Sequence, residues 1–524
     1  MKFQLPYEKR VPGHILADRA ARLGDRPFLT IAGRCYTYGD VFEHSQALAR
    51  GLRGIGVGTQ EPVLIMLDNS PQFIFSWFAL MLLNAIGVPV NTAYAGDVLG
   101  YVIRDSGAKV VLTDASLARA FSDLPSGARG ALSTIVVSGT GELPANAGFT
   151  SLADVLVPQG PTIVAAATPA DASLICYTSG TTGPSKGVVL PHSHNLQTVQ
   201  TCINSVGIGP EDVIFSPLPL FHGMSRTMGT LPALVLGAQI HLAPRFSATS
   251  FWNDIRASQA TVAITIFTIP PILKAKPPGP GDRDHRLRVT FNAHHDPEFE
   301  DRFGVRIVEA HGMTEVGITV HTEYPERRLG AAGRASADWD VALFDDNDQP
   351  VAVGQEGELV VRPRKPGLMM NGYLNQAEAT LSACRNLWFH SGDIMREDED
   401  GYLFFAGRKK ESIRRRGENI SSYEIEAVVA QHPEIVECAV VGVPAGDGED
   451  DVYLVAVPRT CESLVPEDLH AWLRSRLPKF MVPRYVELFE SLPKTGSGKI
   501  EKFKLSATVP AAAWDSQRVA VAAH

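Results

Sequence analysis

The stretch that decides the fold of this 524-residue chain is Tyr177-Thr178-Ser179-Gly180-Thr181-Thr182-Gly183-Pro184-Ser185-Lys186-Gly187. From Thr178 to Gly187 it holds five Ser or Thr hydroxyls, three glycines and one lysine. Glycines let backbone N–H groups turn toward an anion, hydroxyls add short donors, and lysine adds a mobile positive charge. Residues 173–177 predict a short buried strand just before it. The stretch therefore predicts a polyphosphate-binding loop at the end of a strand.

The spacing excludes two common nucleotide-binding patterns. A Walker loop needs Gly directly before Lys and Ser or Thr after it, whereas Ser185 precedes Lys186 and Gly187 follows. A second candidate, at Lys499, also fails because Ile500 follows the lysine. The loop is not a dinucleotide fingerprint either. A polar loop that binds nothing is the plain alternative, and it fits the ordered mixture of donors poorly.

The loop resembles the phosphate loop of the AMP-forming acyl-CoA synthetase family, also called the adenylate-forming superfamily. The family's usual form is Thr-Ser-Gly-Thr-Thr-Gly-x-x-Lys-Gly, and only the proline, Pro184, is displaced by one place here. The following His192-Ser193-His194-Asn195 is similar to the family's Thr-His-x-Asn tail. The resemblance, which covers about residues 27–504, implies that ATP phosphates are held by Thr178, Ser179, Gly180, Thr181, Thr182, Gly183 and Lys186.

Composition sets the broad class of the protein. A chain of 524 residues should split into two or three domains. Its 45% hydrophobic and 20% charged residues are ordinary for a soluble globular protein. A net charge of −9 argues against broad nucleic-acid binding. The six cysteines show no metal-binding spacing and predict reduced thiols, so we expect a cytoplasmic protein.

No integral membrane segment is expected. The most apolar run, residues 73–90, is broken by Ser76, Asn84 and Gly87, which favours a buried helix leading into a strand at 87–90 over a membrane span. The N-terminal sequence has no apolar signal core, and the last residues match no targeting signal.

Alternating helix and strand patterns over roughly the first four hundred residues predict a layered α/β domain. One clear unit is a helix at 97–105, a stop at Gly107 and a strand at 108–113. Residues 125–150, rich in Gly, Ala, Ser and Pro, predict a surface excursion, and 277–284 another loop.

The composition changes near Arg408, where six of nine residues up to Arg416 are basic. A helix at 421–432, strands at 436–443 and 453–457, and a helix at 466–477 follow, which predicts a compact α+β unit. The basic run is open to three interpretations: a solvated patch, a nucleic-acid patch, or the border of nucleotide and coenzyme A phosphates. We expect an N-terminal domain over 1–409 and a mobile C-terminal domain over 410–524.

Two further motifs of the large domain resemble those of the family. His222, in Pro-Leu-Phe-His, resembles a residue beside the substrate carboxylate, and histidine suits that place because it titrates near neutral pH. His311-Gly312-Met313-Thr314-Glu315 resembles Tyr-Gly-Met-Thr-Glu. The resemblance implies that Thr314 contacts the α-phosphate and Glu315 helps hold Mg²⁺. His311 in place of tyrosine alters the adenine-stacking face.

The remaining motifs surround the expected domain hinge. Asp393, in Ser-Gly-Asp, resembles the acceptor of both ribose hydroxyls, and Arg408 resembles the group that grips ribose and phosphate. Lys410 falls on the family's hinge position. Arg416 and Gly417 stand where the family has the Gly-Gly of its Gly-Gly-Glu-Asn loop, which later faces coenzyme A. A tail motif, Pro-x-Thr-x-Ser-Gly-Lys-Ile, implies that Lys499 bridges the acyl carboxylate and the α-phosphate.

The acid pocket departs from the family pattern. The family's Gly-Gly-Ala-type turn is replaced by Phe291-Asn292-Ala293-His294-His295, which suggests a polar pocket unless these histidines lie on a surface loop. The candidate pocket residues are Phe221, His222, Met224, Phe267, His294, His295 and Val316. Segments 68–78 and 303–307 look similar to the crotonobetaine/carnitine-CoA ligase branch.

The resemblance implies an ATP-binding, magnesium-dependent ligase that adenylates a carboxylic acid, releases pyrophosphate and transfers the acyl group to coenzyme A, with release of AMP. The catalytic candidates are Lys499, His222, Glu315 and Lys410. A biosynthetic enzyme that passes the acyl group to a carrier protein, an amine or another nucleophile remains open, as does a nucleotide-sensing homologue without catalysis. The identity of the acid and homodimer formation also stay open.

Overall fold

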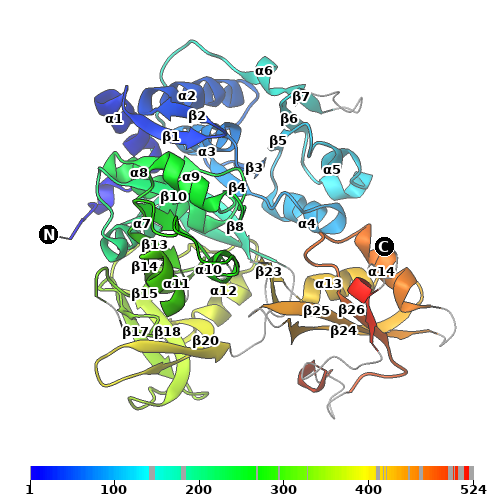
Figure 1. The fold of residues 1–524 in the computed structure, drawn as a ribbon. Coiled ribbons are helices and arrows are strands. Elements are labelled where there is room, and N and C mark those ends of the chain that lie inside the picture. The colour runs from blue at the N-terminus through cyan, green and yellow to red at the C-terminus, as the bar shows by residue number, and fades with distance from the viewer. Residues whose placement is uncertain are drawn as a thin grey trace.

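The computed structural model describes residues 2–140, 148–178, 185–266, 269–292, 295–326, 328–408, 413–416, 418–420, 422–445, 449–459, 464–493, 500, 502–505 and 513–518. Figure 1 shows a large body, coloured blue to yellow along the chain, and a smaller orange-to-red body beside it. The large body contains two wide sheets and a smaller antiparallel one. This arrangement confirms the predicted α/β fold with a small C-terminal domain.

The first wide sheet carries the strands on both sides of the predicted phosphate loop. In spatial order it contains β19 (Gly372–Tyr373), β9 (Lys186–Pro191), β8 (Ala172–Thr178), β4 (Ile86–Pro89), β3 (Pro62–Met66), β5 (Val110–Asp114), β6 (Thr134–Ser138) and β7 (Phe149–Ser151). Side chains of β3 alternate between two apolar clusters, with Val63 and Ile65 in one and Leu64 and Met66 in the other. Both faces are therefore buried, as is usual for parallel strands.

The second wide sheet carries the other predicted motifs. Its spatial order is β16 (Arg334–Ala335), β15 (Gly317–His321), β14 (Arg306–Met313), β13 (Val289–Asn292), β12 (Val262–Ile264), β10 (Val213–Ser216), β11 (Gln239–Leu242), β1 (Pro27–Ile31) and β2 (Arg34–Thr37). Its five central strands, β10 to β14, pair in parallel, and β14 and β15 form an antiparallel hairpin.

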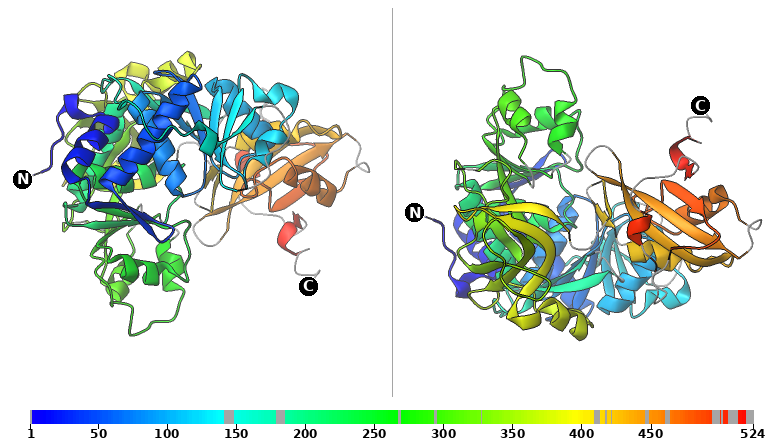
Figure 2. Two further views of the ribbon diagram at one scale, coloured as in Figure 1. Left: turned by 90° about the horizontal axis from the view of Figure 1, so that it is seen from above. Right: turned by 90° about the horizontal axis from the view of Figure 1, so that it is seen from below.

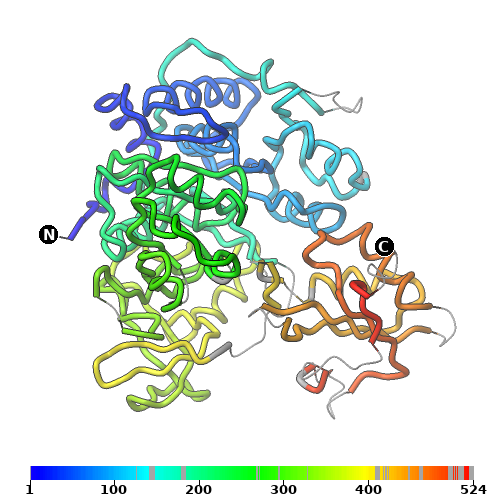
Figure 3. Tube along the Cα trace, in the orientation of Figure 1, coloured from blue at the N-terminus to red at the C-terminus, as the bar shows by residue number. Residues whose placement is uncertain are grey.

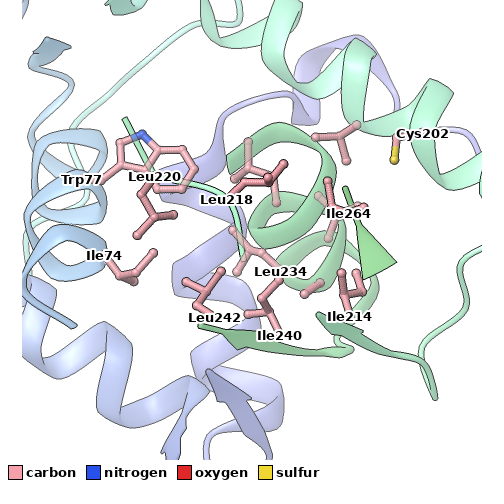
Figure 4. Packing of buried hydrophobic residues seen from close by; sticks show 14 of the residues in the cluster. Ile74, Trp77, Cys202, Ile214, Leu218, Leu220, Leu234, Ile240, Leu242 and Ile264 are labelled. Carbon is pink, nitrogen blue, oxygen red and sulfur yellow. The ribbon is translucent and has the colours of Figure 1, made fainter. Parts of the chain in front are cut away.

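One apolar core joins the two wide sheets. It is built on α1 (Pro12–Leu23), α2 (Tyr38–Gly54), α3 (Pro71–Leu83), α7 (His192–Val206) and α8 (Leu231–Leu236). Figure 4 shows Ile74 and Trp77 of α3 beside Leu218, Leu220 and Leu242 of the second sheet and its connections. The first sheet's other face is covered by α4 (Gly96–Ser106) and the short α5 (Arg119–Ser122).

Helix α3 accounts for the most apolar run of the sequence. It starts with Pro71 after the Ser70 side chain, which accepts a hydrogen bond from the Phe73 N–H at 3.2 Å, and it ends at Asn84 in the left-handed region. Apart from its first turn, nearly all of its residues are buried, so the expected buried helix is confirmed. In the described part of the chain, no helix is both long and apolar enough to span a bilayer.

Most of the local predictions are confirmed, but one is wrong. Helix α4, its end at Gly107 with φ +66°, and β5 match the predicted unit. Residues 125–150 are not only a surface excursion, because β6 forms a strand with four buried residues between β5 and β7. The β-branched run at 134–138 decides this segment, and the Gly, Ala and Pro of its flanks concealed it.

The four-stranded antiparallel sheet leads the chain toward the small domain. It consists of β17 (Trp339–Phe344), β18 (Glu356–Pro363), β20 (Phe389–Glu397) and β21 (Leu403–Arg408). Figures 2 and 3 show this yellow sheet next to the orange small domain, with α1 at the far side of the large body. The predicted boundary at 409/410 lies outside the described residues and stays a prediction.

The small domain has its own apolar core, with Ile425, Leu454 and Leu469 at its centre. Its elements are β22 (Ile413–Arg415), β23 (Glu418–Ile420), α13 (Ser422–Val429), β24 (Ile435–Pro444), β25 (Asp450–Pro458), α14 (Pro466–Arg474), β26 (Tyr485–Leu488) and β27 (Trp514–Asp515). The predicted helix at 421–432 and the two predicted strands are confirmed.

Candidate active site

The lysine of the predicted phosphate loop is connected to the acidic residue of another motif through a tyrosine. Lys186 begins β9, and its Nζ lies 4.7 Å from the centre of the Tyr373 ring in β19. The Tyr373 hydroxyl donates a hydrogen bond to Glu315 Oε1 at 2.9 Å. Thr178 ends β8 beside Lys186. The loop residues Ser179, Gly180, Thr181, Thr182 and Gly183 lie outside the described residues.

Two glycines hold the turn that carries Glu315. Gly317 has φ +65°, and a Cβ there would collide with the Thr198 hydroxyl. A Cβ on Gly312 would collide with the carbonyl of Gly317 across the β14–β15 hairpin. The carbonyl of Glu315 also accepts a hydrogen bond from the Met370 N–H at 2.8 Å. Thr314, Glu315 and Val316 are therefore presented on a rigid hairpin turn.

A histidine pairs with the expected ribose-binding carboxylate. The Asp393 side chain is buried, and its Oδ2 lies 2.8 Å from Nε2 of His311. The His311 ring lies nearly parallel to that of Phe405, with centroids 6.3 Å apart, and Phe405 is 46% exposed. Asp393 is also directly opposite Arg408 in the β20–β21 pair. Three predicted nucleotide-binding residues are thus brought together, beside an exposed ring that sequence reasoning missed.

His222 lies where the two domains meet. It follows a segment held by Asn69, whose side chain donates to the Leu218 carbonyl at 2.9 Å and accepts from the Leu220 N–H at 2.7 Å. Nε2 of His222 lies 3.0 Å from the carboxylate of Glu418 in β23. Glu418 also accepts a hydrogen bond from Asn91 Nδ2 at 3.3 Å.

A second carboxylate of the small domain reaches the phosphate-loop region. Glu424 Oε1, at the start of α13, accepts hydrogen bonds from both the N–H and the hydroxyl of Ser185. Burial raises the pKa of the Glu424 carboxyl, and the two bonds from Ser185 act in the opposite direction. Glu418 and Glu424 thus connect the small domain to two separate motifs of the large one.

Arg416 adopts a backbone conformation that explains the glycine of the family motif. Its φ is +56°, in the left-handed region that glycine occupies at the least cost. Its N–H is held by the Glu449 carboxylate. The neighbouring Gly417, the hinge candidate Lys410 and the catalytic candidate Lys499 lie outside the described residues.

The candidate pocket residues are found in different surroundings. Phe221 and Met224 are half-buried at the start of the second sheet's connection to α8, and Val316 is buried in the hairpin turn. The His295 ring is directed at α11 (Pro297–Phe303), 3.6 Å from the carboxylate of Glu300. Phe267 and His294 lie outside the described residues.

Sequence reasoning missed five residues of this region: Asn91, Ser185 as a contact, Tyr373, Phe405 and Glu424. Each lies outside the quoted motifs or was assigned only a place in a loop or helix. Their partners are far away in the sequence, so no local pattern marks them.

Comparisons with known proteins agree with this arrangement. The AMP-binding enzyme family matches residues 16–374, and the AMP-binding enzyme C-terminal domain matches residues 424–499. The crotonobetaine/carnitine–CoA ligase of Salmonella paratyphi A is 30% identical over 505 residues, which is 93% of this chain and 97% of that protein.

Two solved structures share the fold. The anthranilate CoA ligase AuaEII, in complex with anthranoyl-AMP, is 25% identical with a TM-score of 0.72, over 96% of this chain and 97% of that one. The amide bond synthetase McbA of Marinactinospora thermotolerans is 24% identical with a TM-score of 0.81, over 94% and 98%, and shows the likeness of fold alone. With both family domains matched in order along the chain, this protein belongs to the AMP-binding, adenylate-forming enzyme family.

Proposed function

We propose that this protein is an AMP-forming acid–thiol ligase that converts a carboxylic acid to its coenzyme A thioester. The observation that carries the proposal is the chain of contacts Lys186–Tyr373–Glu315. It joins the lysine of a phosphate-loop motif to the acidic residue of a second motif. A cation and a carboxylate so placed suit a polyphosphate and its counter-ion.

The reaction has two half-reactions. In the first, a carboxylate oxygen of the acid bonds to the α-phosphorus of ATP, and the bond to the β-phosphate oxygen breaks to release pyrophosphate. In the second, the coenzyme A thiol loses its proton to solvent, its sulfur bonds to the acyl carbon, and AMP leaves with the electron pair of the broken C–O bond. Adenylation supplies a good leaving group, which the free carboxylate lacks.

The proposed roles follow the positions of the side chains. Lys186 and residues 178–183 hold the phosphates, and Thr314 contacts the α-phosphate. Asp393 and Arg408 bind the ribose, with the rings of His311 and Phe405 beside the base. His222 lies by the reacting carboxylate, and Lys499 stabilises the charge that moves from the carboxylate to the phosphate.

We assign Mg²⁺ to Glu315. Among the described residues no group of three or more His, Cys, Asp or Glu side chains gathers as a metal cage. A single carboxylate fits Mg²⁺, which commonly takes one or two protein carboxylates and completes its shell with phosphate oxygens and water. When bound, the ion would neutralise phosphate charge.

The acceptor thiol reaches the acyl-adenylate after the small domain has turned about Lys410. The contacts of Glu418 with His222 and of Glu424 with Ser185 support a small domain that docks on the large one. Coenzyme A is the proposed acceptor, in keeping with the names of the relatives. The five described cysteines are free, which supports a reducing, cytoplasmic setting.

A second candidate is transfer to a non-CoA nucleophile. It is favoured by Arg416, where the family's coenzyme A loop has glycine, and the fold is shared with an amide bond synthetase. A panel of carboxylic acids with Mg·ATP, each with and without coenzyme A, separates the two. Multiple-turnover AMP release that requires coenzyme A supports the ligase, whereas pyrophosphate release that coenzyme A does not accelerate supports another acceptor.

Lys499→Ala tests the division of labour between the half-reactions. We expect the variant to lose adenylation but to keep thioester formation from supplied acyl-adenylate, because the lysine serves only the first step. Equal loss of both half-reactions would contradict domain alternation.

A further inference from the structure

Arg226 is a buried charge that the proposed chemistry does not use. It lies in the π-helical turn Ser225–Thr230, only four residues after His222, and is 1% exposed. Its Nη2 donates to the Phe221 carbonyl at 3.4 Å and lies 3.6 Å from Cys176 Sγ. Within the described part of the chain, its Nε and Nη1 have no hydrogen-bond partner and no carboxylate pairs with it.

The surroundings of Arg226 do not compensate for its charge. Guanidinium groups stay protonated in proteins, so burial leaves a full positive charge in the core. The nearest stabilising group is the Trp77 ring, whose centre lies 5.6 Å from the guanidinium carbon. A cation–π contact is a weak substitute for an anion, because the desolvation of an ion is much the larger effect. The arginine therefore lacks an anionic partner, which a bound ligand would supply.

Arg226 lies beside two of the residues that the sequence predicts to line the acid pocket. Its guanidinium bonds to the backbone of Phe221, and Met224 occupies the same segment, where both side chains are half-buried. Trp77, which Figure 4 shows beside Leu220, forms the other side of the arginine's surroundings. A second anchor for the acid at this position would extend the pocket from the reacting end near His222 toward α3.

A second buried group with incomplete hydrogen bonding, His194, lies near Val316, another residue that is predicted to line the pocket. His194 of α7 is 4% exposed, and within the described residues its ring nitrogens make no well-formed hydrogen bond, with the Asn195 side chain as a weak partner. Burial lowers its pKa to about 4, so the ring is neutral and still offers one N–H. It lies against Gly317, the residue after Val316, and α7 packs on the π-helical turn. Two buried, donor-bearing side chains with incomplete hydrogen bonding thus lie beside residues that are predicted to line the pocket.

We propose that the acid carries a second anionic group besides its reacting carboxylate, and that Arg226 pairs with this group and selects for it. The inference rests on the proposed function, since it concerns the acid of that reaction. The proposal also distinguishes this chain from the relatives named for crotonobetaine and carnitine, because the guanidinium would repel the trimethylammonium group of those two acids.

Matched acids and matched variants test the proposal. The acids are linear dicarboxylic acids of four to six carbons, their monomethyl esters, which lack the second charge, and carnitine. The proteins are the wild type, Arg226→Met, Arg226→Lys and the control Arg53→Met, which makes the same change at an exposed arginine of α2. ATP–pyrophosphate exchange reports adenylation, and the shift of Tm with each acid reports binding without turnover.

We expect the wild type to prefer a diacid over its ester and over carnitine. Arg226→Met should lower kcat/KM for the diacid by at least about 30-fold, which is the usual effect of breaking a buried charge pair. Its kcat/KM for the ester should stay within about threefold of the wild-type value. The kcat/KM of Arg226→Lys for the diacid should fall between the values of the wild type and Arg226→Met, and Arg53→Met should match the wild type. The loss should appear in the KM of the acid and leave the KM of ATP unchanged.

Three results would overturn the proposal. In the first, the wild type uses the monomethyl esters as well as the diacids. In the second, Arg226→Met lowers kcat/KM for all acids alike. In the third, Arg226→Met raises the KM of ATP with every acid, which would assign the charge of Arg226 to binding of the nucleotide. If no acid supports ATP–pyrophosphate exchange, the proposed function fails, and the shift of Tm on addition of each acid then tests the inference by itself. A diacid shift in the wild type that Arg226→Met lacks would support the pairing, and no shift would reject it.

Discussion

At the scale of single residues, the contact between His311 and Asp393 leads to a prediction about the proposed nucleotide site. The ring nitrogen lies 2.8 Å from the carboxylate that we assign to the ribose hydroxyls, so the histidine competes with the nucleotide for that carboxylate. The family motif has tyrosine at this position, which offers a larger ring to the base.

We therefore expect His311→Tyr to lower the KM of ATP several-fold, because it frees Asp393 and enlarges the stacking surface. Initial-rate pyrophosphate release over a range of ATP concentrations measures this. The gain should disappear in the double variant His311→Tyr with Asp393→Asn. A higher KM in the single variant would mean that the histidine itself binds the nucleotide.

Two buried histidines lead to a prediction about how the stability of the protein depends on pH. Burial lowers the pKa of His192 and of His194 to about 4. In the unfolded chain such rings take up protons below about pH 6.5, so the unfolded state binds more protons between pH 4 and 6.5. The stability that the neutral rings provide is therefore lost as the pH falls through this window, by at most about 1.4 kcal/mol per pH unit and histidine.

Urea denaturation at several pH values between 4 and 7.5 measures this slope. His194→Leu should flatten the dependence of the unfolding free energy on pH, whereas His44→Gln, at an exposed position, should leave it unchanged. An unchanged slope in His194→Leu would show that this ring gains a proton in the folded state.

At the scale of elements, the β14–β15 hairpin fixes Glu315 through its glycines. Gly317→Ala should destabilise the protein by about 1–3 kcal/mol, because alanine must adopt φ +65° and its Cβ meets the Thr198 hydroxyl. Adenylation should fall with it, since the turn carries Thr314 and Glu315.

The matched control for this hairpin is Gly54→Ala, at the end of α2, where a Cβ would meet no atom within 4 Å. It should be neutral or slightly stabilising, since alanine favours a helix over glycine. Thermal unfolding of both variants makes the comparison. Equal Tm values for the two would mean that the hairpin can relax around a side chain.

Elements were predictable from the sequence where the pattern is local. The helix at α4 carries its own stop at Gly107, and β24 and β25 follow the apolar runs at 436–443 and 453–457. The prediction was wrong at β6, because a five-residue strand leaves a short signal beside a long Gly- and Pro-rich context. The Tyr373–Glu315 contact could not be predicted, because it joins β19 of the first wide sheet to the β14–β15 turn of the second, and no local pattern reports how two sheets lie against each other.

At the scale of the whole molecule, two carboxylates of the small domain contact motifs of the large one. Glu418 contacts His222 and Asn91, and Glu424 contacts Ser185. The small domain also lies near α4, since a Cβ on Gly96 would be 3.6 Å from the Arg476 carbonyl. These contacts hold β23 and α13 against the motif that carries His222 and the residue before Lys186. The proposed reaction in two steps would use such docking in one step and its release in the other.

Glu418→Ala should therefore separate the two half-reactions. It removes the carboxylate that reaches both His222 and Asn91, and hydrogen bonds to charged groups contribute about 1.5–3 kcal/mol, so the docked state should lose about ten- to a hundredfold in population. If this docked state serves thioester formation, coenzyme A-dependent AMP release should fall by that factor while ATP–pyrophosphate exchange stays within about twofold. Glu467→Ala, exposed on α14 of the same domain, is the control and should change neither rate. The reverse pattern, slow exchange with normal transfer of supplied adenylate, would assign the contact to adenylation, because the residue would then stabilise the other arrangement of the domains.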